Sequence, residues 1–130
     1  MKKDDSQQCD PAERVPLLPA VFHIMLALAE GDCHGYGIMQ EVERLTDGQI
    51  HLGPGTLYRS IQRMLVDGFI EELDNPDAAD ADRRRCYRLT AFGRRVAREE
   101  ARRLATLVKA SLARGVLPRQ PARAHRVERN

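Results

Sequence analysis

Apolar residues recur along this chain with a period that changes from helical to extended and back again. The clearest helical stretch is LGPGTLYRSIQRMLVDGFI, residues 52–70. Gly53 suits its N-cap, Pro54 its first turn and Gly68 its end. One face is apolar at helical spacing. That face consists of Leu57, Ile61, Met64 and Leu65. The pattern predicts a helix whose opposite face is presented to solvent or to a ligand.

Two more helices are predicted before this one. The first begins at residue 17 or 18 and runs to about residue 30, and the second covers about residues 36–45 after a loop at 32–37. The first is apolar around most of its circumference, so in a small domain it needs cover from its own core and from a partner subunit. Its candidate partner contacts are Val21, Phe22 and Met25. The second and third helices have the spacing of a helix-turn-helix.

After Gly68 the period shortens to that of a strand. Residues 69–73 and 84–89 read as two strands joined by about ten polar residues, which predicts a β-hairpin with a long loop. A hairpin directly after a helix-turn-helix is a wing. The expected fold is therefore mainly α with a small β-hairpin, a winged helix-turn-helix in the α+β class.

The last helix is predicted from Ala91, after Thr90 as N-cap, to about Leu112. A seam for a second helix repeats along it at a spacing of three and four residues. The seam consists of Ala97, Ala101, Leu104, Val108 and Leu112. A second stripe, Phe92, Val96 and Leu107, is expected to bind the helix to its own domain. The alternative is a single helix that packs only on its own monomer.

Length and composition favour this association of two chains. With 130 residues, 5% aromatic and 31% charged, the chain can build one modest aliphatic core. We expect a disordered arm at 1–15, a winged helix-turn-helix domain at 16–90, a dimerisation helix at 91–113 and a flexible basic tail at 114–130.

The net charge of +2 hides a strong asymmetry. Residues 1–82 hold 6 Lys and Arg against 16 Asp and Glu, whereas residues 83–130 hold 15 against 3, so the two parts carry −10 and +12. Such a basic region suggests contact with a polyanion, although arginines that merely solvate a helix give the same count.

The outward face of the helix at 54–67 and the second strand carry the side chains that double-stranded DNA requires. Arginine can bind guanine edges, glutamine adenine edges, and hydroxyls and backbone amides suit phosphates. The candidates on the helix are Gly55, Thr56, Tyr58, Arg59, Ser60, Gln62 and Arg63. Those on the strand are Arg84, Arg85 and Arg88. An ordinary amphipathic surface helix also turns charges outward, so this face alone leaves both interpretations open.

Cysteine usage and hydropathy exclude several other classes. Cys9, Cys33 and Cys86 are odd in number and lack the spacing of a zinc site or redox motif, which indicates a reducing cytoplasm. The longest apolar run, residues 21–29, is too short to span a bilayer. No catalytic set, phosphate loop or metal-ligand spacing emerges, so we expect no enzyme, no cofactor and no metal. Cys86 lies among arginines, which leaves a thiol-based redox response as an alternative.

Three blocks of the sequence resemble the PadR family of bacterial winged helix-turn-helix regulators. They are HGYG at 34–37, PGTLY at 54–58 with GFI at 68–70, and RCYRLT at 85–90 with Gly93. The resemblance covers about residues 18–112, and the single helix after the wing resembles the short branch of the family. The chain has no Trp, so the stacking drug pocket of some short members is not expected.

The resemblance implies a homodimeric repressor that binds an inverted repeat in a promoter, with Thr56, Tyr58 and Arg59 near DNA. The last helix would supply the dimer interface, the first helix would contribute, and a small-molecule inducer could release the DNA. A winged-helix module that binds another protein through the acidic second helix is the competing interpretation.

Overall fold

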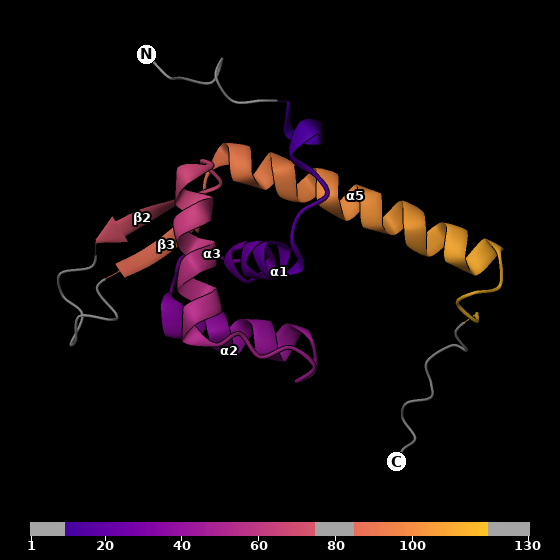
Figure 1. Cartoon of the computed structure of the whole chain (residues 1–130), viewed down its shortest axis with the longest axis horizontal. Coiled ribbons are helices and arrows are strands. Elements are labelled where there is room, and N and C mark those ends of the chain that lie inside the picture. The colour runs from indigo at the N-terminus through magenta and orange to yellow at the C-terminus, as the bar shows by residue number, and fades with distance from the viewer. Residues whose placement is uncertain (1–9, 75–84, 120–130) are drawn as a thin grey trace. The chain divides into compact units, whose positions relative to one another are not determined.

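The computed structural model describes residues 10–74 and 85–119 (Figure 1). Its helices and strands, in chain order, are η2 (Pro11–Arg14), α1 (Pro19–Leu28), β1 (Cys33–His34), α2 (Gly35–Leu45), α3 (Pro54–Val66), β2 (Ile70–Asp74), β3 (Arg85–Leu89) and α5 (Ala91–Ala113). In the described part of the chain, the strands form an antiparallel sheet in the order β1-β3-β2. The predicted winged helix-turn-helix is confirmed.

The three helices α1, α2 and α3 pack around one aliphatic core because each turns its apolar stripe inward. The side chains with almost no exposed surface are Ile24, Met25, Leu28, Ile38, Val42, Leu57, Ile61, Met64 and Val96. On α3 the buried positions recur every three or four residues, as the sequence predicts. This spacing fixes which face of α3 is left outside.

The start of α5 is bound to the turn between α3 and β2. The Thr90 hydroxyl lies 2.6 Å from the Gly68 carbonyl oxygen, to which it donates, and it accepts a hydrogen bond from the Gly93 amide at 2.9 Å. A β-carbon at Gly93 would overlap the Phe69 carbonyl group. Only glycine therefore allows α5 to lie this close to the backbone of the turn.

Contacts divide the chain into two compact units, one that ends at Glu100 and one that begins at Ala101. The winged helix unit therefore takes in the first turns of α5, and the boundary lies within this helix rather than at its start. In the second unit Leu107 is 52% exposed. Phe92 and Val96, in the first unit, are buried, and the contact predicted for Leu107 with its own domain stays a prediction.

The loop predicted at 32–37 is wrong in part, because Cys33 and His34 form β1. This strand pairs with β3, Cys33 opposite Tyr87 and His34 opposite Cys86. Two residues are too few for any alternation to appear in a sequence, so the third strand could be found only from its partner. The His34 ring then caps α2, since its Nδ1 accepts a hydrogen bond from the Gly37 amide at 3.1 Å.

Residues 11–14 also differ from the predicted disordered arm. Asp10 accepts a hydrogen bond from the Ala12 amide at 3.0 Å and starts the short helix η2. Arg14 then pairs with Asp67 at 3.2 Å, and its guanidinium carbon lies 5.1 Å from the centre of the Phe69 ring. These partners are more than fifty residues away in sequence, which explains why the local composition gave no sign of them. Residues 1–9 and the tail from 120 onward lie outside the described residues.

Candidate nucleic-acid interface

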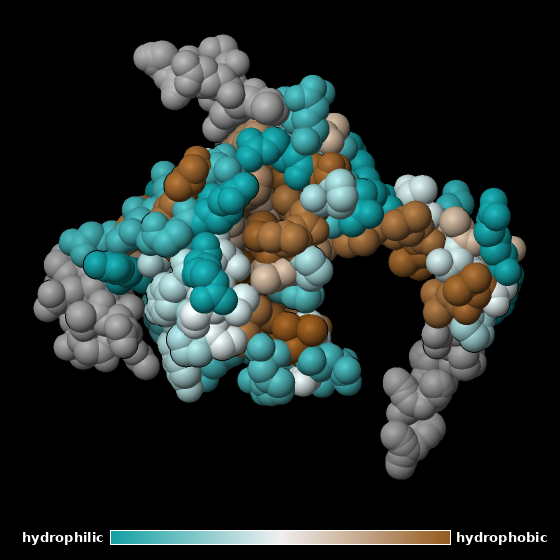
Figure 2. All heavy atoms as spheres, in the orientation of Figure 1, coloured by the Kyte–Doolittle hydropathy of each residue, from teal (hydrophilic) through white to brown (hydrophobic). Residues whose placement is uncertain are grey.

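The outer face of α3 is exposed and polar, as its pattern predicts. Thr56, Arg59, Gln62 and Arg63 are exposed, whereas Ser60 is half-buried. The surface over α3 is largely hydrophilic or neutral in Figure 2, while hydrophobic residues gather over α1 and along α5. Pro54 occupies the first turn, and among the described residues no side chain caps the amides that follow Gly53. The first turn of α3 therefore offers backbone donors beside exposed side chains.

Two arginines of α3 already have partners on their own helix. Arg59 lies 3.5 Å from the Thr56 hydroxyl, and Arg63 donates from Nε to Asp67 at 3.3 Å. The Arg63 side chain remains three-quarters exposed. Exposed pairs of this kind contribute little free energy, about 0–1 kcal/mol, so they can be exchanged for contacts with DNA.

The wing balances its arginines with carboxylates from the neighbouring strand. Arg88 on β3 donates to Glu71 on β2 at 3.0 Å, and Arg85 pairs with Glu72 at 3.6 Å. All four side chains are at least two-fifths exposed. Arg84, the third predicted phosphate contact on the wing, lies outside the described residues. The described part of β3 is thus less positive than its sequence suggests.

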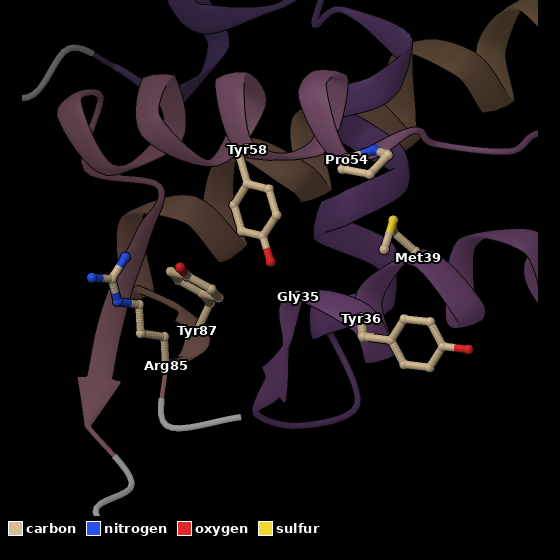
Figure 3. A pocket seen from close by; sticks show the side chains of 7 residues that line it. All are labelled: Gly35, Tyr36, Met39, Pro54, Tyr58, Arg85 and Tyr87. Atoms are coloured by element: carbon tan, nitrogen blue, oxygen red, sulfur yellow. The ribbon is translucent and has the colours of Figure 1, made fainter. Parts of the chain in front are cut away.

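A cleft of about 510 Å³ opens where α2, α3 and β3 meet (Figure 3). Its lining consists of Gly35, Tyr36, Met39, Pro54, Tyr58, Arg85 and Tyr87. These include all three tyrosines of the chain, and we call this site the tyrosine cleft. Tyr58, Arg85 and the neighbouring Gly55 are among the DNA contacts that the sequence predicts, whereas Tyr36 and Tyr87 are not. Their three segments are far apart in sequence, and no spacing rule predicts that they meet.

Tyr58 reaches across the tyrosine cleft from α3 toward Gly35 (Figure 3). A β-carbon at Gly35 would overlap the Tyr58 hydroxyl, so the glycine provides the space for the phenol. Tyr58 is 41% exposed. The ring therefore does not simply close the core, and its hydroxyl is within reach of a ligand in the cleft.

Tyr87 on β3 lines the same cleft and is only 3% exposed. Burial raises the pKa of its phenol, and the nearby Glu72 carboxylate raises it further. The hydroxyl is consequently neutral and able to donate at physiological pH. Among the residues that the structure describes, no group forms a hydrogen bond with it.

The two cysteines of the sheet have contrasting neighbours. Cys33 lies against Gly37, where a β-carbon would come within 2.6 Å of its sulfur, and burial raises the pKa of the Cys33 thiol. Cys33 faces Tyr87 and Cys86 faces His34 in the sheet register, which places the two thiols on opposite faces. The redox alternative rests on the run of arginines around Cys86. In the described part of that run, Arg85 and Arg88 pair with Glu72 and Glu71.

The predicted dimer contacts divide into two groups. Val21 and Met25 are enclosed in the core of their own unit, so their assignment to a partner surface is corrected. They point inward because α1 lies against α2 and α3. The exposed stripe of α1 is instead Leu18, at 71% exposure, the half-buried Phe22 and the exposed Leu26. On α5, Ala101, Val108 and Leu112 are exposed, and Ala97 and Leu104 are half-buried.

Comparison with known proteins supports this geometry. The family model described as the transcriptional regulator PadR-like family matches residues 24–99. The chain is 32% identical over 88 residues to the transcriptional regulator Rv3488 of Mycobacterium tuberculosis. The aligned residues cover 68% of this chain and 78% of that protein.

Solved structures share the fold. A transcriptional regulator from Clostridium thermocellum superposes with a TM-score of 0.63 and 26% identity, over 75% of this chain and 90% of its own. A PadR family transcription regulator from Clostridium difficile superposes with a TM-score of 0.63 and 22% identity, over 75% of this chain and 98% of its own. These neighbours are transcription regulators rather than enzymes. Within the described residues, no helix combines the length and the apolar character needed to cross a membrane.

Proposed function

Because this chain belongs to the PadR-like family of transcriptional regulators, we propose that it is a cytoplasmic homodimeric repressor acting on an inverted repeat in double-stranded DNA. In this proposal α3 enters the major groove of each half-site and the wing lies along the flanking backbone. A small-molecule inducer that releases the DNA is part of the same proposal.

The observation that carries the proposal is the division of α3 into two faces. Leu57, Ile61 and Met64 have no exposed surface, and they anchor the helix on the core of its unit. The opposite face presents an arginine and a glutamine on adjacent turns, together with the open first-turn amides. Arg59, Gln62 and Arg63 are the side chains that we assign to base edges, because their donors and acceptors match guanine and adenine.

The exposed apolar residues of α1 and α5 support the homodimer. Leu18 and Leu26 form an exposed stripe on α1, and Val108 and Leu112 do the same on α5. A regulator with twofold symmetry reads an operator with the same symmetry, since each protomer places one α3 in one half-site.

The test is fluorescence anisotropy of the protein with a labelled duplex from the region upstream of its own gene, against a scrambled duplex, across a salt series. We expect two protomers per site and a preference of at least about 10³-fold for the operator. Equal and steeply salt-dependent binding to both duplexes would leave only general phosphate attraction. Absence of binding at low salt would favour the protein-interaction module instead.

A matched pair of variants assigns specificity to α3. Arg63→Ala should reduce the discrimination between operator and scrambled DNA by about 1–3 kcal/mol if Arg63 contacts a base. Arg95→Ala, which removes an exposed arginine from α5, is the control and should leave the discrimination unchanged. An equal loss on both duplexes for Arg63→Ala would mean that this side chain contacts phosphate only.

A further inference from the structure

We infer that the tyrosine cleft holds a phosphodiester group of the DNA backbone, with the hydroxyls of Tyr58 and Tyr87 as hydrogen-bond donors to its oxygens. The inference rests on the proposed DNA-binding function and deepens it. It adds Tyr87 to an interface that the sequence predicts only on α3 and the arginines of the wing.

The cleft lies where two helices begin. Gly35 and Tyr36 belong to the first turn of α2, and Pro54 begins α3. First-turn amides and the helix dipole create a partial positive charge at each helix start, which favours an anion. The His34 ring uses one amide of α2, whereas in the described residues α3 has no side-chain cap.

The Tyr87 hydroxyl is the second and independent observation. Its side chain is almost completely buried, yet the hydroxyl lines the cleft without a hydrogen-bond partner among the described residues. The hydroxyl itself is open to the cleft, and a hydrogen bond from such a donor to a charged acceptor contributes about 1.5–3 kcal/mol. A phosphodiester is such an acceptor, because it is ionised at neutral pH and its oxygens carry no proton.

The remaining walls suit the sugar on either side of the phosphate. Met39, Pro54 and the faces of the phenol rings are apolar, while Arg85 brings a positive charge to the rim. Among the described residues, Arg85 has an ion pair with Glu72 alone, at 3.6 Å, so its guanidinium can turn toward an anion. At about 510 Å³ the cleft has room for the deoxyribose carbons next to the phosphate as well as for its oxygens.

The first experiment compares Tyr87→Phe with Thr106→Val, an exposed hydroxyl removed from the second unit. Tyr87→Phe should weaken binding to operator and scrambled duplexes by the same factor, about tenfold or more, because a phosphate contact carries no sequence information. The slope of log K against log salt should not change, since the lost group is neutral. The free energy of unfolding should not fall, because the hydroxyl has no partner to lose. Thr106→Val should bind as the wild type does.

The second experiment locates the phosphate. Duplexes with one uncharged methylphosphonate at each successive position are bound by the wild type and by Tyr87→Phe. At one position per half-site, the methylphosphonate and Tyr87→Phe together should reduce the affinity no more than the larger of the two single changes does. If the two losses multiply at every position, Tyr87 contacts no phosphate and the inference is overturned.

The third experiment does not depend on operator recognition. With no Trp in the chain and every tyrosine in the cleft, intrinsic fluorescence reports on this site alone. An abasic deoxyribose-phosphate oligomer, which absorbs no light in this range, should change the fluorescence saturably, and Tyr87→Phe should weaken the effect about tenfold.

The outcomes of this titration separate the two proposals. A response to the oligomer without binding to the operator duplex would support the cleft and count against the proposed function. Operator binding without any response to the oligomer would overturn the cleft and leave the function standing. Inorganic phosphate that saturates the same change at lower concentration than the oligomer would show a free-anion site and overturn the assignment to the DNA backbone.

Discussion

Arg63 of α3 is tied to Asp67, which lies one turn further along, by a hydrogen bond of 3.3 Å from Nε. The other carboxylate oxygen of Asp67 pairs with Arg14 at 3.2 Å, and Asp67 is itself only one-fifth exposed. One carboxylate therefore holds both an arginine of the proposed DNA-reading face and the arginine that fastens the N-terminal segment. DNA must compete with Asp67 for Arg63.

Asp67→Asn should strengthen DNA binding because it removes this competition and one negative charge beside the helix. We expect a gain of about 0.2–1 kcal/mol, about 1.4- to fivefold, which is larger on the operator than on the scrambled duplex because Arg63 is assigned to base edges. The free energy of unfolding should fall by a similar amount as Arg14 loses its partner. Anisotropy titrations and urea unfolding measure the two effects. Glu30→Gln, which removes a carboxylate just after α1, is the control. An equal gain in affinity for this variant would show that the effect comes from the change in net charge alone.

The glutamates of β2 should act in the same way on the wing. In the double variant Glu71→Gln with Glu72→Gln, Arg88 and Arg85 lose their cross-strand partners and become available to phosphates. Affinity for scrambled DNA should rise, and the salt slope should steepen by as much as about 1.8 per protomer if both arginines then contact phosphate. An unchanged slope would mean that the wing does not approach the backbone.

Local signals account for what the sequence predicted correctly. The start and end of α3 follow from Gly53, Pro54 and Gly68, and its buried face follows from the spacing of apolar residues, because both depend on neighbours within a few turns. The beginning of α5 after Thr90 follows in the same way, since the cap bonds to Gly93 three residues later. The exposed polar face of α3 follows from the same spacing, because burial of one face leaves the opposite face outside.

Features that depend on distant partners were missed. β1 is a strand only because β3 lies beside it, and the tyrosine cleft requires α2, α3 and β3 to meet. The sequence predicts Met25 at a partner surface because a helix that is apolar on all sides does not reveal which side faces its own core. It predicts Arg14 in a disordered arm because the partners of Arg14, Asp67 and Phe69, become its neighbours only in the folded chain.

Two apolar-to-acidic substitutions should separate the core from the proposed dimer surface. Met25→Glu places an unpaired charge where no surface is exposed, and the unit should fail to fold. Val108→Glu lies on the exposed side of α5 and should give a folded monomer. Circular dichroism and sedimentation velocity distinguish the two results. A folded Val108→Glu dimer would place the interface elsewhere, and Val108→Ala, which keeps the surface apolar, should remain dimeric.

Gly93→Ala should be among the most destabilising single changes in the winged helix unit. The added β-carbon would overlap the Phe69 carbonyl group, so α5 must move away from the turn and give up hydrogen bonds of Thr90. We expect a loss of about 3 kcal/mol or more in urea unfolding, comparable to other overpacked core positions. Gly53→Ala has open space around its β-carbon and an ordinary φ of −73°, so it should cost no more than about 1 kcal/mol. Similar losses for the two variants would contradict the close approach at Gly93.

The stability of the winged helix unit should fall as the solution becomes alkaline. Burial raises the pKa of Cys33 above its ordinary 9.0 and the pKa of Tyr87 above its ordinary 10.0, so both groups keep their protons in the folded state after the unfolded chain has lost them. The unfolded state then binds fewer protons than the folded state, and the free energy of unfolding decreases with rising pH. The decrease should begin near pH 9 and continue until the folded groups ionise.

Cys33→Ser with Tyr87→Phe should reduce this slope, because the variant removes both shifted groups while keeping their approximate shapes. Urea unfolding at successive pH values measures the slope, and the difference in tyrosinate absorbance between wild type and Tyr87→Phe isolates the ionisation of Tyr87. A midpoint at or below 10.0 in that difference would show that the phenol is not desolvated as its burial requires. A midpoint above 10.0, with a smaller slope in the double variant, would establish that the cleft keeps Tyr87 protonated and available as a donor throughout the physiological range.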